Sequence, residues 1–216
     1  MAIDGIIFDL DGTLWDSCRV VAESWTQTMQ QGCGSDRVFT VDDIKGVMGL
    51  TAADIAAKLF PDHGDDAMKL CLRCMDEELE YISEHSGDVY PGVDDMLSQL
   101  SQRWPLFIVS NCQDGYIQCF FGATGLGKYI KDIECEGATG LGKADNIKLI
   151  CRRNGLENPV YVGDTAGDER SAKAAGCRFV HAAYGFGSVQ APDAVISSVA
   201  ELPAALKLME EENKHV

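Results

Sequence analysis

The sequence predicts an α/β fold, a Rossmann-like parallel sheet core with helices on both faces, plus an inserted α-helical domain. Short apolar runs typical of buried strands alternate with helical patterns near the start of the chain and again from residue 88 onward. Only helical periodicity occurs between these two regions. We therefore expect residues 1–15 and 88–216 to form the α/β core and residues 16–87 to form the inserted helical domain.

The first predicted strand is the apolar run Ile6–Phe8, which leads into Asp9, Asp11, Gly12 and Thr13. Alternate side chains of an extended strand share a face, so Asp9 and Asp11 are expected to point into one site. Most Asp-x-Asp pairs are solvated turns. An EF-hand loop also begins in this way, but it requires Gly and Glu where this chain has Leu14 and Val20.

Helical patterns then follow through the inserted domain. Val21, Trp25 and Met29 recur every four positions within residues 16–32. Thr40 and Thr51 are expected to cap two short helices. A longer helix is expected over about residues 65–85. Its predicted apolar stripe consists of Met68, Cys71, Leu72, Met75, Leu79 and Ile82.

The remaining elements of the core alternate regularly. A helix is expected to begin at Pro91-Gly92 and to end before Trp104-Pro105. Buried strands are expected at 106–109, 130–135, 160–162, 178–181 and 195–196, and helices at 112–121, 144–154, 168–175 and from about 199.

Composition and charge restrict the kinds of molecule that this protein is expected to bind. The formal net charge of −16, from 34 acidic and 18 basic residues, disfavours nucleic acid and anionic membrane surfaces. It also means that a phosphorylated substrate needs a locally positive site. No run of 18 apolar residues and no signal-peptide pattern is found, and the nine cysteines are an odd, unpatterned set. We therefore expect a cytoplasmic protein with reduced thiols.

Polar residues follow several predicted strands, at the edge of a parallel sheet where ligands bind. Ser110 and Asn111 follow one strand, and Asp164 and Asp168 follow another. The segment Gly-Ala-Thr-Gly-Leu-Gly-Lys occurs twice, ending at Lys128 and at Lys143, without the Walker spacing of a phosphate loop. Each piece alone has an ordinary explanation as a turn, a helix cap or a solvated lysine.

Two carboxylates as close as Asp9 and Asp11 repel each other unless a cation or a proton compensates them. Mg²⁺ prefers oxygen ligands and substrate phosphate. The pair therefore suits phosphoryl transfer, in which one carboxylate attacks phosphorus and the other gives a proton to the leaving oxygen.

Four motifs follow one another along the chain: Asp9-x-Asp11-Gly12-Thr13, Ser110, Lys143 and Gly163-Asp164-x-x-x-Asp168. In order and spacing they resemble the motifs of the haloacid dehalogenase superfamily of phosphohydrolases over nearly the whole chain. The helical insert is similar to the small α-helical cap of that superfamily. The stretch from Leu10 to Ser17 is most similar to the phosphoglycolate phosphatase-like branch.

The resemblance implies a role for each catalytic residue. Asp9 would be the nucleophile, and Asp11 would be the general acid and then the base. Ser110 and Lys143 would act on the phosphoryl group, and Lys143 is favoured over Lys128 because it precedes Asp164 by about twenty residues, as in the superfamily.

The resemblance also implies the ligands. Substrate phosphate would be bound by Thr13, Ser110, Asn111 and Lys143. The cofactor would be Mg²⁺, held by Asp9, Asp11 through its backbone carbonyl, Asp164 and Asp168.

The expected function is Mg²⁺-dependent hydrolysis of a small phosphorylated metabolite, phosphoglycolate-like or a sugar phosphate, through an aspartyl-phosphate. The alternatives are a β-phosphoglucomutase-like phosphosugar mutase and a non-catalytic binding protein on the same fold. Haloacid dehalogenases lack an equivalent of Asp11, and phosphonoacetaldehyde hydrolases carry a cap lysine soon after Met-Gly, whereas Met48-Gly49 has none before Lys58. Arg19, Arg37 and Lys45 are cap candidates for substrate selection.

Overall fold

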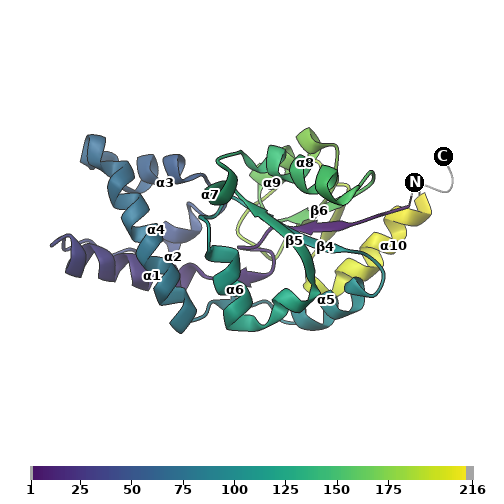
Figure 1. The fold of residues 1–216 in the computed structure, drawn as a ribbon, viewed down its shortest axis with the longest axis horizontal. Coiled ribbons are helices and arrows are strands. Elements are labelled where there is room, and N and C mark those ends of the chain that lie inside the picture. The colour runs from purple at the N-terminus through teal and green to yellow at the C-terminus, as the bar shows by residue number, and fades with distance from the viewer. Residues whose placement is uncertain (1, 213–216) are drawn as a thin grey trace.

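The computed structural model describes residues 2–212, and for Glu212 it describes the backbone only. Its centre is a six-stranded parallel sheet of order β5-β4-β1-β6-β7-β8, which confirms the expected fold class (Figure 1). The strands are β1 (Ile6–Phe8), β4 (Leu106–Ser110), β5 (Ile130–Cys135), β6 (Val160–Gly163), β7 (Arg178–Ala182) and β8 (Ala194–Ile196).

Strand β1 lies in the middle of the sheet and is buried on both faces. It pairs with β4 on one side and with β6 on the other, so that Phe8 lies level with Ile108 and Val162. Ile6 and Phe8 belong to one hydrophobic cluster, whereas Ile7 belongs to a second cluster on the opposite face. This explains why the strand reads as a continuous apolar run rather than as an alternating one.

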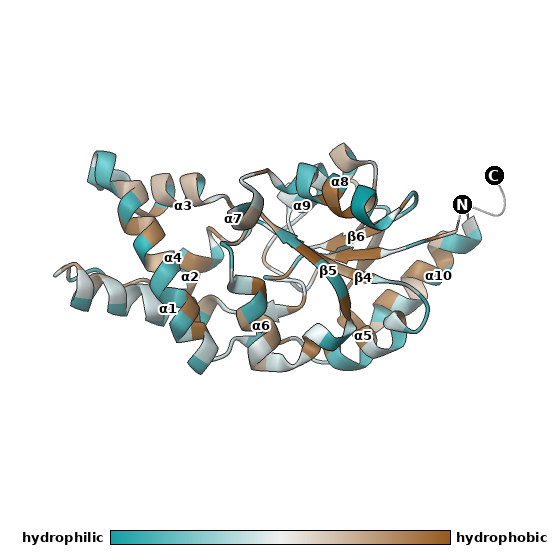
Figure 2. Ribbon diagram, in the orientation of Figure 1, coloured by the Kyte–Doolittle hydropathy of each residue, from teal (hydrophilic) through white to brown (hydrophobic). Residues whose placement is uncertain are grey.

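Helices cover both faces of the sheet. Residues of α5 (Val93–Ser101), α6 (Tyr116–Thr124) and α10 (Leu202–Glu212) pack in the cluster that contains Ile6 and Phe8. Residues of α8 (Lys143–Asn154) and α9 (Ala166–Ala175) pack in the cluster that contains Ile7. Figure 2 shows β4 and β6 as largely hydrophobic, β5 as mixed, and the covering helices with both hydrophobic and hydrophilic residues.

The helices of residues 16–87 gather at one end of the molecule (Figure 1). They are α1 (Cys18–Gln27), continued by a π-helical turn over Thr28–Gly32, α2 (Val41–Lys45), α3 (Ala52–Leu59) and α4 (Ala67–Glu84). The two predicted threonine caps are confirmed. The Thr40 hydroxyl accepts from the Asp43 N–H in a capping box, and Thr51 accepts from the Asp54 N–H.

The predicted apolar stripe of α4 was wrong in part. Met68 and Leu72 are exposed, whereas the buried residues are Cys71, Cys74, Met75, Glu78 and Ile82. A count of apolar residues alone leaves out Glu78, and this shifts the predicted stripe around the helix toward Leu72.

A two-stranded antiparallel ribbon was not predicted from the sequence. Strands β2 (Trp15–Asp16) and β3 (Asp88–Val89) pair where the chain leaves the core and where it returns. Strands of two residues are too short to produce a periodic pattern. Among residues 2–212, no helix has both the length and the apolar character required to cross a bilayer.

The central strands should dominate the stability of the core. Ile108 in β4 is fully buried, whereas Val195 in the edge strand β8 is 55% exposed. Ile108→Ala is expected to lower the free energy of unfolding, measured in urea, by about 2–5 kcal/mol. The substitution leaves a cavity between the sheet and the helices that cover this face. Val195→Ala, the matched control, is expected to change it by less than about 1 kcal/mol. Equal losses for both variants would contradict this account of the core.

Candidate functional site

The carboxyl ends of β1 and β6 bring three carboxylates together. Asp9 follows β1, Asp164 follows β6, and Asp168 lies in the first turn of α9. One carboxylate oxygen from each residue lies within 4.8 Å of the others, and all three residues are buried. Neighbouring parallel strands end at the same edge of a sheet, and this accounts for the convergence of residues more than 150 positions apart.

Lys143 is the cation of this cluster. It is the first residue of α8, and its Nζ lies 2.9 Å from Asp9 Oδ1 and 2.6 Å from Asp168 Oδ1. Its side chain is only 3% exposed. The other oxygen of Asp168 accepts hydrogen bonds from the Thr165 N–H at 3.0 Å and from its hydroxyl at 2.6 Å. Asp168 therefore both caps α9 and holds the lysine.

Charge is unevenly distributed in the cluster. Burial, together with the nearby Asp168 carboxylate, raises the pKa of Asp9 well above its usual range despite Lys143. Burial alone would lower the pKa of Lys143, but the charges of Asp168 and Asp9 outweigh it and raise that pKa. Burial opposes ionisation of Asp168, but Lys143 and Thr165 outweigh it and lower its pKa. Three carboxylates share one ammonium group, so a further cation would be stabilised here.

Asp164 carries the clearest sign of a missing cationic ligand. Its Oδ2 accepts the Phe186 N–H at 2.7 Å, whereas its Oδ1 is buried without a hydrogen-bond partner. Burial, and then the charge of Asp168, raises its pKa to about 7. An unpartnered carboxylate oxygen beside two further carboxylates fits a divalent cation with a preference for oxygen ligands.

Gly12 allows the first loop to approach this cluster closely. Its φ is +80°, and a Cβ at this position would collide with the Asp164 carboxylate. Only glycine meets both requirements without strain.

Asp11 lies in a different environment from Asp9. Its Oδ1 accepts hydrogen bonds from Trp15 Nε1 at 3.0 Å, the Ser17 hydroxyl at 2.7 Å and the Tyr116 hydroxyl at 2.9 Å. Burial raises its pKa, although these three hydrogen bonds lower it. Its carboxylate is not part of the three-carboxylate cluster. Strand β1 ends at Phe8, so strand alternation does not by itself place the Asp11 carboxylate, which lies beyond the strand.

The three predicted phosphate-binding residues without charge lie around the same loops. Thr13 Oγ1 is buried and has no partner. The Ser110 hydroxyl accepts only a long hydrogen bond, 3.3 Å, from the Cys112 N–H. The Asn111 amide donates to the Gly49 carbonyl at 2.8 Å, and its Oδ1 is buried without a partner. All three therefore keep hydrogen-bonding capacity for a ligand.

A pocket opens beside Asp11, between the helices of residues 16–87 and the sheet edge. It holds about 490 Å³ of space between its atoms, including its open mouth. Ser110 and Asn111 line it from β4, and Trp25, Met48 and Met75 line it from the helical part. None of Arg19, Arg37 and Lys45 is among the described residues that line this pocket.

Glu78 is a pocket residue that the sequence analysis missed. It extends from α4, is 4% exposed, and accepts hydrogen bonds from Trp25 Nε1 and from Gln113 Nε2, the latter at 2.7 Å. Burial raises its pKa to about 7, although the bonds from Gln113 and Trp25 lower it. A signal was present, since Glu78 continues the spacing of Cys71, Cys74 and Met75 on the buried face.

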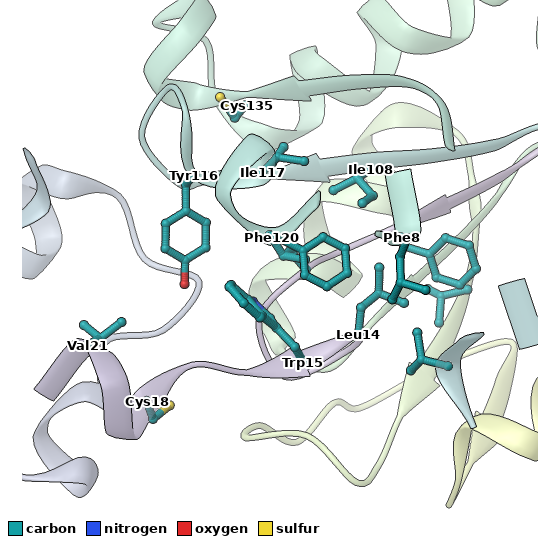
Figure 3. Packing of buried hydrophobic residues seen from close by; sticks show 14 of the residues in the cluster. Phe8, Leu14, Trp15, Cys18, Val21, Ile108, Tyr116, Ile117, Phe120 and Cys135 are labelled. Atoms are coloured by element: carbon teal, nitrogen blue, oxygen red, sulfur yellow. The ribbon is translucent and has the colours of Figure 1, made fainter. Parts of the chain in front are cut away.

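Tyr116 was also missed as a site residue. It is the first residue of α6, and its hydroxyl contacts Asp11 and Ser17. Its ring packs edge-on against Trp15, which in turn packs edge-on against Phe120, at the junction between the two parts of the molecule (Figure 3).

Comparison with known proteins agrees with this geometry. A family model described as haloacid dehalogenase-like hydrolase matches residues 6–182. The chain is 27% identical over 242 residues to a phosphoglycolate phosphatase of Escherichia coli K12, with 98% of this chain and 96% of that protein covered. It is 29% identical over 225 residues to the phosphoglycolate phosphatase of Photobacterium profundum, with 94% and 95% covered.

Solved structures agree in fold. A haloacid dehalogenase-like family hydrolase from Streptococcus pneumoniae superimposes with a TM-score of 0.80 at 24% identity, and the match covers 94% of this chain and 97% of that one.

Removing the buried cation should destabilise the fold. Without Lys143, Asp9 and Asp168 lose their only ammonium partner, so Lys143→Met is expected to lower the free energy of unfolding by about 3–5 kcal/mol in chelator. The matched control is Lys128→Met, at the same position of the repeated segment, where the side chain is 59% exposed. We expect it to cost less than about 1 kcal/mol. Urea denaturation measures both variants, and equal costs would refute the assignment of a buried ion-pair network.

Glu78 should make stability depend on pH. Its pKa rises from a usual 4.5 to about 7 in the folded state, so the folded state binds its proton more tightly than the unfolded state. Its contribution is therefore complete below about pH 4.5 and is lost as the pH rises through about 7. Relative to Glu78→Gln, the wild type is expected to lose about 3 kcal/mol of unfolding free energy across this window. Urea denaturation at pH 5 and pH 8 measures the difference, and a constant offset between the two proteins would contradict the shift.

Proposed function

This chain belongs to the haloacid dehalogenase-like hydrolases and is a phosphatase of that family, and we propose that it hydrolyses a small phosphomonoester by transferring the phosphoryl group to Asp9. One observation carries the proposal. Asp9 is buried in an ion-paired cluster with Lys143, beside Asp164 with its unpartnered oxygen and next to a pocket lined by Asp11. These neighbouring groups support the assignment of a nucleophile, a cation, a hard-metal site and a proton donor to this edge of the sheet.

Asp9 is the proposed nucleophile. Lys143 occupies its Oδ1, which leaves Oδ2 for attack on phosphorus. A bond forms between this oxygen and phosphorus as the bond from phosphorus to the leaving oxygen breaks. Lys143 fixes the carboxylate and offsets the negative charge of the phosphoryl oxygens.

Asp11 is the proposed acid and base. Its raised pKa favours a bound proton, which it gives to the leaving oxygen. In the second step it takes a proton from the water that attacks the aspartyl-phosphate. The bond between phosphorus and the Asp9 oxygen breaks, so that phosphate is released and the Asp9 carboxylate is restored. Trp15, Ser17 and Tyr116 hold its carboxylate in place through both steps.

Thr13, Ser110 and Asn111 are proposed to bind phosphoryl oxygens together with Lys143. Asp9, the Asp11 backbone carbonyl, Asp164 and Asp168 are proposed to hold Mg²⁺, which when bound supplies the positive charge that a dianionic phosphate requires in this acidic cluster.

Residues 16–87 are proposed to form a cap domain over the core of residues 1–15 and 88–216. Hydrogen bonds join the parts over the site, from the Asn111 amide to the Gly49 carbonyl and from Gln113 Nε2 to the Met75 carbonyl and the Glu78 carboxylate. The ribbon of β2 and β3 ties the two connections together and gives the cap a pivot. Closure would exclude water while the phosphoryl group is transferred.

The proposal is tested by phosphate release from a panel of phosphorylated metabolites with Mg²⁺ and with chelator. The wild type is expected to release phosphate only with Mg²⁺. Asp9→Asn should lose about 10³-fold or more of the rate, because an amide is a poor nucleophile. Lys128→Met, far from the site, should retain the wild-type rate. An isomerised product with little free phosphate would instead indicate a phosphosugar mutase. A function that survives Asp9→Asn intact would indicate a binding protein.

A further inference from the structure

The pocket beside Asp11 contains acidic groups and no cation. Its lining includes two carboxylates, Asp11 and Glu78, and no Lys, Arg or His among the residues that the structure describes. The leaving group of the substrate must occupy this pocket, because Asp11 and Ser110 belong both to its wall and to the proposed reaction centre. The charge of the wall therefore acts directly on the leaving group.

The wall offers hydrogen-bond acceptors that lack donors. The Glu78 carboxylate receives one bond from Trp25 and one from Gln113, although a carboxylate accepts about four. Asn111 Oδ1 has no partner, and its orientation is fixed because the amide nitrogen must face the Gly49 carbonyl. These acceptors are satisfied by a ligand that donates, as a hydroxyl group does.

Two cations of the helical part, Lys45 and Arg37, contact groups outside the pocket. Lys45 Nζ lies 4.0 Å from Asp16 and 5.9 Å from the Phe186 ring centre. Arg37 stacks over the rings of Phe39 and Phe60, with its guanidinium carbon 4.4 Å and 5.2 Å from the ring centres. Neither lines the pocket.

A carboxylate on the leaving group would therefore meet like charge without a counter-ion. Burying an unpaired anion beside the Glu78 carboxylate, which is ionised above about pH 7, is costly, whereas a hydroxyl pairs with the free acceptors. The rest of the wall, which includes Val21, Trp25 and Met75, is apolar and suits a carbon chain or the face of a sugar ring.

On the basis of the proposed function, we propose that Glu78 and Asn111 make this pocket select phosphomonoesters with an uncharged, hydroxyl-bearing leaving group and reject leaving groups that carry a carboxylate. Glycolate, the leaving group named by the curated relatives, is of the rejected kind. Among the small phosphomonoesters that the proposed function allows, the expected substrates are therefore sugar or polyol phosphates.

Two matched ester pairs test the inference. 2-Hydroxyethyl phosphate and 2-phosphoglycolate differ in one terminal group, as do glycerol 3-phosphate and 3-phosphoglycerate, with a hydroxymethyl group replacing a carboxylate in each pair. In the wild type with Mg²⁺, kcat/KM is expected to be at least about tenfold higher for the hydroxyl member of each pair. Equal or reversed preference overturns the inference and leaves the proposed function standing.

Two variants assign the selection to Glu78. Glu78→Gln is expected to narrow each ratio by about threefold or more, because it removes the repelling charge. Glu77→Gln removes a charge one residue away on the outer face of α4, where the side chain is 47% exposed, and should leave the ratios unchanged. Thermal denaturation confirms that each variant is folded. An unchanged ratio in folded Glu78→Gln overturns the role of Glu78.

A binding measurement separates failure of the inference from failure of the proposed function. Calorimetric titration of Asp9→Asn with the same four esters and Mg²⁺ reports the pocket without turnover. We expect the hydroxyl members to bind at least about tenfold more tightly. Absence of phosphate release from these esters and from p-nitrophenyl phosphate refutes the proposed function, and the binding ratio still decides the pocket. Absence of binding by every ester overturns both.

Discussion

The site is governed by the electrostatic cost of three buried carboxylates around a single ammonium group. Asp9, Asp164 and Asp168 lie close together, and Lys143 reaches two of them. In a medium of low dielectric constant such an excess of negative charge is tolerated only if protons or a further cation compensate it. The same cost favours the binding of a cation among these carboxylates. The cluster requires a rigid frame, which the paired strands β1 and β6 supply.

The two aspartates of the first loop lie in different environments, and this difference is the basis for the different roles proposed for them. Lys143 binds Asp9 from the core, whereas Trp15, Ser17 and Tyr116 bind Asp11 with neutral donors. Burial raises the pKa of both carboxyl groups, but only Asp9 has an ammonium partner that favours its ionised form. Asp11 has neutral donors alone, and on this ground the proposed mechanism assigns the proton to Asp11. Two of these donors, Trp15 and Tyr116, pack edge-on against each other, and Trp15 packs edge-on against Phe120, at the junction of the two parts (Figure 3).

Features specified by local sequence were predictable, and features that depend on a neighbour were not. The run Ile6–Phe8 and the cap at Thr40 were read correctly because burial on both faces and capping leave a local pattern. The resemblance named the three residues that the structure brings together in the cluster, and it assigned Asp11 to the metal only through its backbone carbonyl, which fits a carboxylate outside the cluster. Glu78 and the ribbon of β2 and β3 were missed, since a lone acid on a buried stripe and a two-residue strand acquire meaning only from their partners, Trp25, Gln113 and the opposite strand.

The repeated segment separates what sequence determines from what the tertiary structure decides. In both copies the threonine hydroxyl donates to the carbonyl four residues earlier, at 2.6 Å for Thr124 and 3.1 Å for Thr139. In both, the next glycine ends the helix at nearly the same φ, 70° and 69°. Local sequence thus fixed the same helix end twice. The two lysines differ, because the first copy precedes β5 and the second follows it. Only the second copy therefore reaches the edge where parallel strands end, and Lys143 is buried against Asp9 while Lys128 is left 59% exposed.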